Sequence, residues 1–230
     1  EVHEEVVDQV FYLAVVVLSD DPSERDTVDG SEGMVADEGA EPAVGGEVLP
    51  ALHMDDGTQI VHAVLAEVHA HIALAQEAVR EFGFDEIQFD YIRFCTERGS
   101  SECVYDEEDV KGRDKISIIT ECVTYLSENL KKEGVFVSCD VFGTIIRSQV
   151  DSRAVGQSYS QMASVLDYIC PMVYPSHYAK GSFGLDAPDT EPYEAIRGAL
   201  KRSRTELSRA QAESAGRQAV VRPWLQSFTA

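Results

Sequence analysis

The stretch GFDEIQFDYIRF, residues 83–94, carries the clearest strand pattern in the sequence. Ile87 and Phe89 alternate with Gln88 and Asp90, so the apolar pair faces one side of a strand and the polar pair the other. An apolar side that packs against helices would leave Asp90 on the opposite face, at the C-terminal end of the strand. Such a position is typical of functional residues in parallel α/β proteins.

A second stretch, VFVSCDVFG at residues 135–143, repeats this arrangement. Its polar face ends in Asp140, at the height that Asp90 has on the preceding strand. Neighbouring strands lie about 4.8 Å apart, so the two carboxylates are expected within about 5–10 Å of each other. Glycosidases place their two carboxyl groups about 5–5.5 Å apart for retention and about 6.5–9.5 Å apart for inversion. We therefore select Asp90 and Asp140 as the candidate catalytic pair.

Strand and helix patterns alternate along the whole chain, which predicts βαβ units and a parallel sheet. The expected strands are 10–18, 86–94, 135–141, 168–174 and 219–225. The expected helices are 59–82, 114–133, 152–166 and 191–215. Neither GxGxxG nor GxxxxGK occurs, so the motif-defined nucleotide folds are not supported. The interpretation is one α/β domain over 1–230, a (β/α)8 TIM barrel that is incomplete in this chain. It would hold about strands three to seven, with further strands expected before residue 1 and after residue 230.

Charge narrows the range of partners. The 230 residues include 41 acids and 19 Lys and Arg, a net charge of -22. Such a surface repels nucleic acid and anionic lipid. The longest apolar run, 10–18, is too short to cross a bilayer, and the acidic N-terminal residues do not resemble a signal peptide. Ten acids fall within 20–47, so 20–57 is expected to be an acidic loop or insertion. Two explanations stay open: adaptation to a salty environment, or one acidic loop on an ordinary protein.

Metal and cofactor motifs are not found. The sequence has no HExxH, no GxSxG and no EF-hand spacing in the acidic loop, so we expect no metal and no cofactor. The five cysteines include no CxxC pair. Cys95 and Cys103 share one short loop and could form a disulfide, whereas the other three are expected to be small core residues.

Aromatic and polar residues gather at the ends of several expected strands. Tyr and His can stack on a sugar face and hydrogen-bond its hydroxyls, and a Trp can serve as a stacking platform. A Trp is also an ordinary core residue, so that alternative stays open. The residues selected for substrate binding are Tyr91, Arg93, Tyr174, His177, Tyr178, Trp224 and Gln226.

Five segments together resemble a known family. They are VFYLAVVVLSDD (10–21), GFDEIQFDYIRF (83–94), VSCDVFG (137–143), DYICPMVYPSHY (167–178) and VRPWLQSFTA (221–230). In this order they are similar to the signature blocks of a glycosyl hydrolase-like domain family with a TIM-barrel fold. The resemblance implies an O-glycosyl hydrolase that acts on a polysaccharide or oligosaccharide. By analogy with related barrels it also implies that Asp90, on the fourth strand, is the nucleophile and Asp140, on the fifth, the proton donor.

Local sequence suggests the same roles for the two carboxylates. Arg93 would favour the ionised form of Asp90, and the apolar neighbours Val141 and Phe142 would raise the pKa of Asp140. The substrate class suggests an extracellular or cell-surface location, although the sequence itself leaves the location unknown.

The sequence also departs from the family pattern. Cys95 stands where the family usually has Pro, and Ala14, Val15 and Val16 stand where its third strand carries an Arg. Residues 20–57 do not match the family's loop. The alternatives are therefore a non-catalytic carbohydrate-binding barrel, or a barrel that offers only an interaction surface. Open barrel edges could also lead to self-association.

Overall fold

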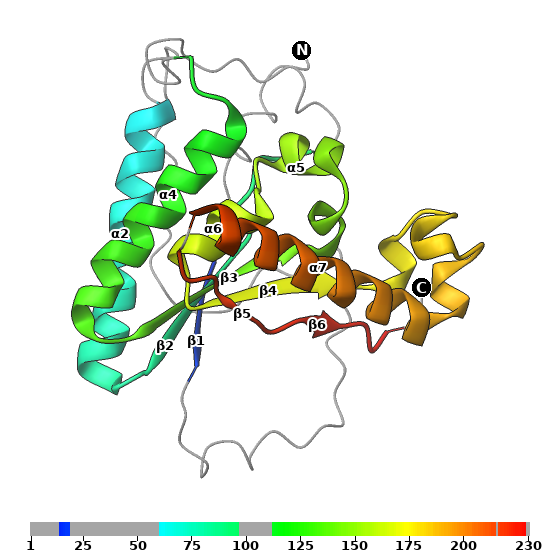
Figure 1. The fold of residues 1–230 in the computed structure, drawn as a ribbon. Helices are drawn as coiled ribbons and strands as arrows, with labels where there is room; N and C mark the ends of the chain where they lie inside the picture. Colours follow the sequence, from blue (N-terminus) through cyan, green and yellow to red (C-terminus); the bar gives the residue numbers. More distant parts are fainter. Residues whose placement is uncertain (1–13, 19–59, 97–111, 215, 229–230) are drawn as a thin grey trace, which may run out of the picture.

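The computed structural model describes residues 14–18, 60–96, 112–214 and 216–228 (Figure 1). The strands are β1 (Ala14–Leu18), β2 (Glu86–Asp90), β3 (Phe136–Phe142), β4 (Tyr168–Val173), β5 (Val220–Val221) and β6 (Trp224–Leu225). The α-helices are α2 (Ile60–Phe82), α4 (Lys115–Leu130), α5 (Gln149–Val155), α6 (Tyr159–Val165) and α7 (Pro192–Ser214). The 3-10 turns are η3 (Lys131–Glu133), η4 (Gly143–Ile146), η5 (Pro175–His177), η6 (Ser182–Gly184) and η7 (Pro188–Thr190).

The sheet has the order β1-β2-β3-β4-β5, and β6 continues the pairing with β4 beyond β5. The pairs β2–β3, β3–β4, β4–β5 and β4–β6 are all parallel. Helices α4, α5, α6 and α7 lie in the connections between these strands, as parallel strands require. The prediction of an α/β fold with a parallel sheet is confirmed for this part of the chain.

The first strand does not follow the prediction. β1 pairs with β2 in the antiparallel direction, with Ala14 opposite Asp90 and Leu18 opposite Glu86. The prediction of five parallel strands is therefore wrong for β1. A continuous apolar run indicates a buried strand but contains no information about its direction. Residues 10–13 of the expected strand lie outside the described residues.

Two other expected strands are shorter than predicted. The strand expected over 86–94 ends at Asp90, because Tyr91 has a φ of 58°, a left-handed conformation that breaks the extended backbone. The strand expected over 219–225 is divided into β5 and β6. The division falls at Arg222 and Pro223, and Pro223 has no N–H to donate to a neighbouring strand.

The helix expected over 152–166 is two short helices, α5 and α6. Gly156, with a φ of 77°, ends α5, and a Cβ at this position would lie 2.8 Å from the carbonyl oxygen of Lys115. The side chain of Gln157 then bonds the backbone of two strand ends, donating to the Ile92 carbonyl and accepting from the Phe142 N–H. The break therefore brings a polar side chain to the ends of β2 and β3.

The hydrophobic core lies between the sheet and its helices. Ile87 and Phe89 from β2, and Val137 and Cys139 from β3, are fully buried in it. α2 and α4, which lie side by side in Figure 1, cover this side of the sheet together with α5 and α6. The opposite side carries the polar residues of the same strands.

Close backbone packing joins β3 to β4 at their C-terminal ends. Gly143 follows β3 directly, and a Cβ there would lie 2.3 Å from the Met172 carbonyl oxygen and 2.8 Å from the Tyr178 hydroxyl. Glycine is required at this position because no side chain fits.

Parts of the sequence analysis fall on residues that the structure does not describe. The acidic segment 20–57 and Cys103 belong to these, so the loop and the Cys95–Cys103 disulfide stay predictions. Of the other cysteines, Cys139 and Cys170 are buried and Cys122 packs against the core. Among the helices described, none has the length and apolar character needed to span a membrane.

Candidate functional site

The two candidate carboxylates lie toward the C-terminal ends of two neighbouring parallel strands, β2 and β3. Phe89 pairs with Cys139 across the parallel strands β2 and β3, so Asp90 and Asp140 are the next positions in register. The interaction is close enough for the negative charge of Asp90 to raise the pKa of Asp140. The parallel register thus brings together two acids that are 50 residues apart in sequence.

Asp140 is held by two neutral N–H donors. The Gln88 side-chain amide donates to Asp140 Oδ1 at 2.6 Å, and the Trp224 indole Nε1–H donates to the same oxygen at 2.8 Å. Within the described residues, Oδ2 accepts no hydrogen bond from the protein. When Asp140 is protonated, the proton therefore belongs on Oδ2, since Oδ1 is already committed as an acceptor.

The environments of the two acids both disfavour ionisation. Burial raises the pKa of Asp140 to about 6, and the charge of Asp90 adds to this, although the N–H groups of Trp224 and Gln88 oppose the shift. Burial also raises the pKa of Asp90, but the hydrogen bond from the Tyr91 N–H and the charge of Arg93 act in the opposite direction. Asp140 is the one whose pKa comes near neutrality.

An ion pair lies on the same face of the sheet as Asp140, closer to the N-terminal ends of β2 and β3. Arg222 donates from both terminal nitrogens to the Glu86 carboxylate, and its Nη2 also donates to Gln88 Oε1 at 3.1 Å. Ser138 donates a further bond to Glu86. Burial alone would raise the pKa of Glu86, but the bonds from Arg222 and Ser138 outweigh it and lower that pKa.

The bond from Arg222 fixes the orientation of the Gln88 amide. Because its oxygen accepts from Arg222, its NH₂ group must point toward Asp140. Glu86, Arg222, Gln88 and Asp140 therefore form one connected chain of hydrogen bonds. Gln88 is 1% exposed and Glu86 8%, so these two members of the hydrogen-bond chain are buried, whereas the Arg222 side chain is 40% exposed.

A cluster of aromatic side chains lies around Tyr174, the residue that follows β4. Partial burial raises the pKa of Tyr174, and the charges of Asp140 and Asp90 raise it further. The rings of His177 and Phe228 pack edge-on against Tyr174, with centroids 5.2 and 5.4 Å away.

Trp224 combines a polar contact with an exposed ring. Its N–H binds Asp140, yet the residue is 47% exposed. An indole whose N–H is held while about half of the residue is exposed is suited to contact with a sugar ring.

Tyr91 and Arg93 form the rim beside Asp90. Tyr91 is 51% exposed and has a left-handed backbone, an uncommon conformation that costs about 1–3 kcal/mol and is concentrated at functional sites. The Arg93 guanidinium carbon lies 5.9 Å from the Tyr91 ring centroid and 5.3 Å from that of Phe142. The positive charge is thus kept near Asp90 by two rings.

The remaining selected residues are placed differently. Tyr178 turns to the helix side of the sheet, where it is buried with Val173 and Ala199, rather than joining the carboxylates. Gln226 accepts from both the backbone N–H and the hydroxyl of Ser176, so it ties the C-terminal segment to η5.

Three residues of the connected chain, Glu86, Gln88 and Arg222, were not selected from sequence. The signal for the first two was present, since they share the strand face of Asp90. Arg222 shares the parity of Trp224 and follows the same rule. Their pairing, across more than 130 positions, needs the fold. In the described ranges, no group of three or more His, Cys, Asp or Glu residues is arranged to hold a metal ion.

Comparison with known protein families gives a match over residues 32–230 to a family described as "Putative glycosyl hydrolase domain". The chain belongs to this family. The resemblance found in the blocks 83–94, 137–143, 167–178 and 221–230 is thereby confirmed, whereas the segment 10–21 lies outside the matched residues. Curated proteins, in contrast, give no match.

Solved structures give distant likenesses to this member of the glycosyl hydrolase domain family. The spore cortex-lytic enzyme SleL of Bacillus megaterium QM B1551 is 13% identical, with a TM-score of 0.43 over 65% of this chain and 29% of that chain. SleL of Bacillus cereus is 11% identical, with a TM-score of 0.40 over 67% and 32%. The Group IV chitinase of Ostrinia furnacalis is 18% identical, with a TM-score of 0.36 over 59% and 36%. The chain thus spans about a third of the length of each.

Proposed function

We propose that this protein is a glycoside hydrolase that cleaves O-glycosidic bonds with Asp90 and Asp140 as its two carboxylates. One observation carries the proposal: the two acids are neighbours on adjacent parallel strands, and the pKa of Asp140 is raised to about 6. Glycoside hydrolysis needs one carboxyl group that is protonated near neutral pH and one that is ionised. Membership of the glycosyl hydrolase domain family supports the same reaction class.

In the proposed reaction, Asp140 protonates the departing glycosidic oxygen from Oδ2, because Gln88 and Trp224 occupy Oδ1. Asp90 stays ionised and stabilises or traps the positive charge that develops on the sugar ring. The bond to the leaving group breaks with its electron pair on the oxygen, which takes the proton. Asp140 then takes a proton from the incoming water, whose oxygen forms the new bond to the sugar carbon. If Asp90 has bonded that carbon, this bond breaks at the same time and its electron pair returns to the Asp90 carboxylate, so that both acids regain their starting states.

The substrate we propose is a polysaccharide or oligosaccharide bound against the exposed Trp224 face, with Tyr174 and Tyr91 around the reacting sugar. We further propose that β2, β3, β4 and the divided strand formed by β5 and β6 are consecutive staves of a (β/α)8 barrel, with 1–230 forming part of one domain. The polar face with Asp140 would then point into the barrel. The antiparallel β1 does not support this architecture at its edge.

A second candidate is a barrel that binds carbohydrate without cleaving it. The observation in its favour is that Ala14 of β1 lies opposite Asp90, in the strand where the family usually carries an Arg. A site without that positive charge could retain the stacking surface and lose catalytic power.

Release of reducing sugar from a panel of cell-wall and storage glycans tests the proposal. Turnover that depends on Asp140 supports the hydrolase. Glycan binding measured by calorimetry, with no product from any glycan in the panel, would favour the binding barrel instead.

A further inference from the structure

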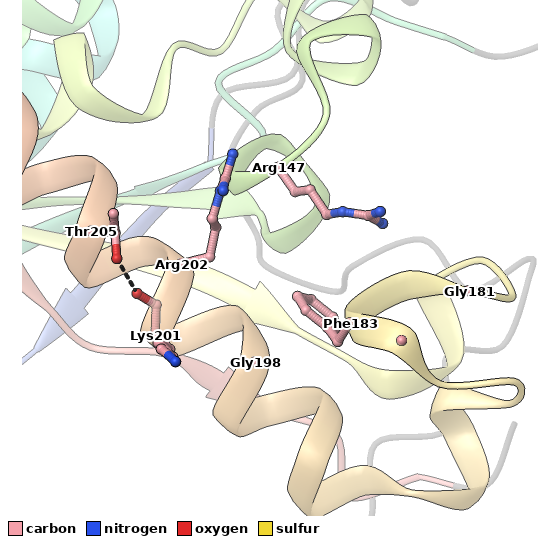
Figure 2. Close-up of a pocket in the computed structure, with 8 residues that line it drawn as sticks. Arg147, Gly181, Phe183, Gly198, Lys201, Arg202 and Thr205 are labelled. Carbon is pink, nitrogen blue, oxygen red and sulfur yellow. Dashed lines mark hydrogen bonds between the residues drawn. The ribbon is translucent and has the colours of Figure 1, made fainter.

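A hollow opens on the helix side of the sheet, between α7, η6 and the end of η4 (Figure 2). Its volume is about 390 Å³, toward the lower end of the about 300–1,000 Å³ typical of small-molecule sites. The residues around it are Arg147, Gly181, Phe183, Gly184, Gly198, Lys201, Arg202 and Thr205. Three of them are basic and none is acidic, in a chain whose net charge is -22.

The charge pattern of α7 explains why these bases remain available. The helix has five basic and three acidic residues. All three acids are taken up by bases near the helix ends: Glu194 pairs with Arg197, and Glu206 and Glu213 pair with Arg209.

The basic residues in the middle of α7 take no part in these ion pairs. Lys201, Arg202 and Arg204 have no carboxylate within 4.0 Å among the described residues, and neither does Arg147. Of these four, Arg204 alone is not part of the pocket lining. The helix thus has a surplus of positive charge where it borders the hollow.

The Phe183 ring forms the aromatic wall of the hollow, and its position is fixed by packing. Phe183 has a φ of 57°, a strained left-handed conformation, and its ring lies against Gly198 so closely that a Cβ there would be 2.7 Å away. Tyr178 packs edge-on against the same ring, with centroids 4.9 Å apart. Packing from two sides therefore fixes the ring, which points toward α7 in Figure 2.

Arg147 lies over this wall. Its guanidinium carbon is 6.0 Å from the Phe183 ring centroid, and Nη1 donates to the Ser182 hydroxyl at 3.0 Å. One bond uses one of five N–H groups, so the others can bind a ligand. In Figure 2 the Arg202 side chain extends from α7 toward the backbone of Arg147, the Arg147 guanidinium extends away from Arg202 and above Phe183, and the Lys201 ammonium points away from both.

We propose that this hollow binds an oxyanion, the carboxylate, sulfate or phosphate group of a small ligand, through Arg147 and Arg202. Two guanidinium groups that form no ion pair with a carboxylate of the described residues suit such a group, because each offers a planar pair of N–H donors. The Phe183 ring supplies an apolar surface for the rest of the ligand. The anion is either free or carried by a charged sugar residue; that the carrier is a sugar rests on the proposed function, but the oxyanion site does not.

Isothermal titration calorimetry at low ionic strength tests the site, with the protein titrated by glucuronate, glucose 6-phosphate, inorganic phosphate and glucose. We expect the anions to bind and glucose not to bind at this site. Arg202→Ala should weaken anion binding at least about tenfold, as the loss of one charge-assisted contact predicts. Arg204→Ala, which removes the same charge from the same helix outside the hollow, should change it less than about twofold. Raising NaCl to molar concentration should abolish most of the binding.

The relative affinities of these ligands distinguish a free oxyanion from one that is carried by a charged sugar. Sugar anions that bind more tightly than inorganic phosphate identify a charged sugar residue, and equal affinities identify a free oxyanion; both support the site. No binding by any anion, or an equal loss in Arg204→Ala and Arg202→Ala, would overturn it. Arg147→Lys keeps a positive charge beside Ser182 of η6 but loses the planar pair of N–H donors, so it should also weaken anion binding. A retained circular dichroism spectrum would show that this variant is still folded. Because calorimetry measures binding without turnover, the result can be interpreted even if the protein proves not to be a glycosidase.

Discussion

The two faces of β2 and β3 are both buried at their centres but are stabilised in different ways. Ile87 and Val137, on the helix side, are 0% exposed, while Gln88 and Ser138, on the other side, are 1% and 0% exposed. The helix side is apolar, and its contribution to stability depends on how completely its side chains fill the core. The other side is polar, and both Gln88 and Ser138 are hydrogen-bonded. Burial alone therefore does not tell which face supports the fold and which supports chemistry; the partners do.

The largest expected effect is on stability, from the helix-side face. Ile87→Ala should lower the free energy of unfolding by about 2–5 kcal/mol, because it leaves a cavity in a close-packed core. Urea unfolding measures this. Leu74→Ala, at a position 56% exposed, should change it by less than about 0.5 kcal/mol. A loss below about 1 kcal/mol at Ile87 would mean that the two faces do not differ as described.

Substitutions on the opposite face should affect catalysis and leave stability nearly unchanged. Asp90→Asn and Asp140→Asn should each lower kcat on a cleaved glycan by at least about a hundredfold, with the melting temperature nearly unchanged. The amide oxygen of an Asn at 140 can still accept from Gln88 and Trp224. Asp189→Asn, at an exposed position in η7, is the matched control and should leave kcat as it is. Near-normal turnover in either site variant would remove that residue from the mechanism.

The ion pair beneath Asp140 should contribute to stability in a pH-dependent way. Glu86→Gln should cost about 1–3 kcal/mol at pH 7, because Arg222 loses its charged partner. The pKa of folded Glu86 is lowered, so the contribution is present above the ordinary Glu pKa and is lost as pH falls through the lowered value. Urea unfolding at pH 7 and pH 3 should show the difference shrinking in acid. Glu128→Gln, an exposed change on α4, should show no such trend; a pH-independent difference would contradict the ion-pair account.

The smallest effect concerns the pH profile. If Asp140 is the proton donor, kcat/KM should fall as pH rises through about 6, since the protonated form is the active one. The Trp224 N–H favours the ionised form and so lowers this pKa. Trp224→Phe should therefore move the basic limb to higher pH, whereas Tyr193→Phe, on exposed α7 surface, should not. A limb that moves to lower pH would contradict the assigned hydrogen bond.

The alternation of residues along the strands was enough to predict where Asp90 and Asp140 lie. Period-two patterns fix the face of each side chain, and successive parallel strands fix the common edge. The same logic fails past the end of a strand, where the backbone turns: Tyr178, selected with Tyr174, packs on the helix side. It fails also for β1, whose direction depends on a connection that the apolar run does not describe.

Pairings between distant segments are harder still to predict. Arg222 meets Glu86 and Gln88 across more than 130 residues, and no local pattern contains that information. The sequence could say that each of the three is polar and on a strand. That one residue orients another, and through it Asp140, follows from the three-dimensional arrangement alone.

Gly143 has a consequence for how this protein can vary. It stands three residues after Asp140 and four before Arg147, and the Met172 carbonyl occupies the space that any side chain would need. A substitution at this position must push β3 away from β4 and shift both flanking residues at once. In a library containing all twenty amino acids at position 143, selection for folded protein should return glycine alone. The carboxylate pair and the basic hollow are therefore both connected to this one tightly packed position, and a substitution at Gly143 should disturb both.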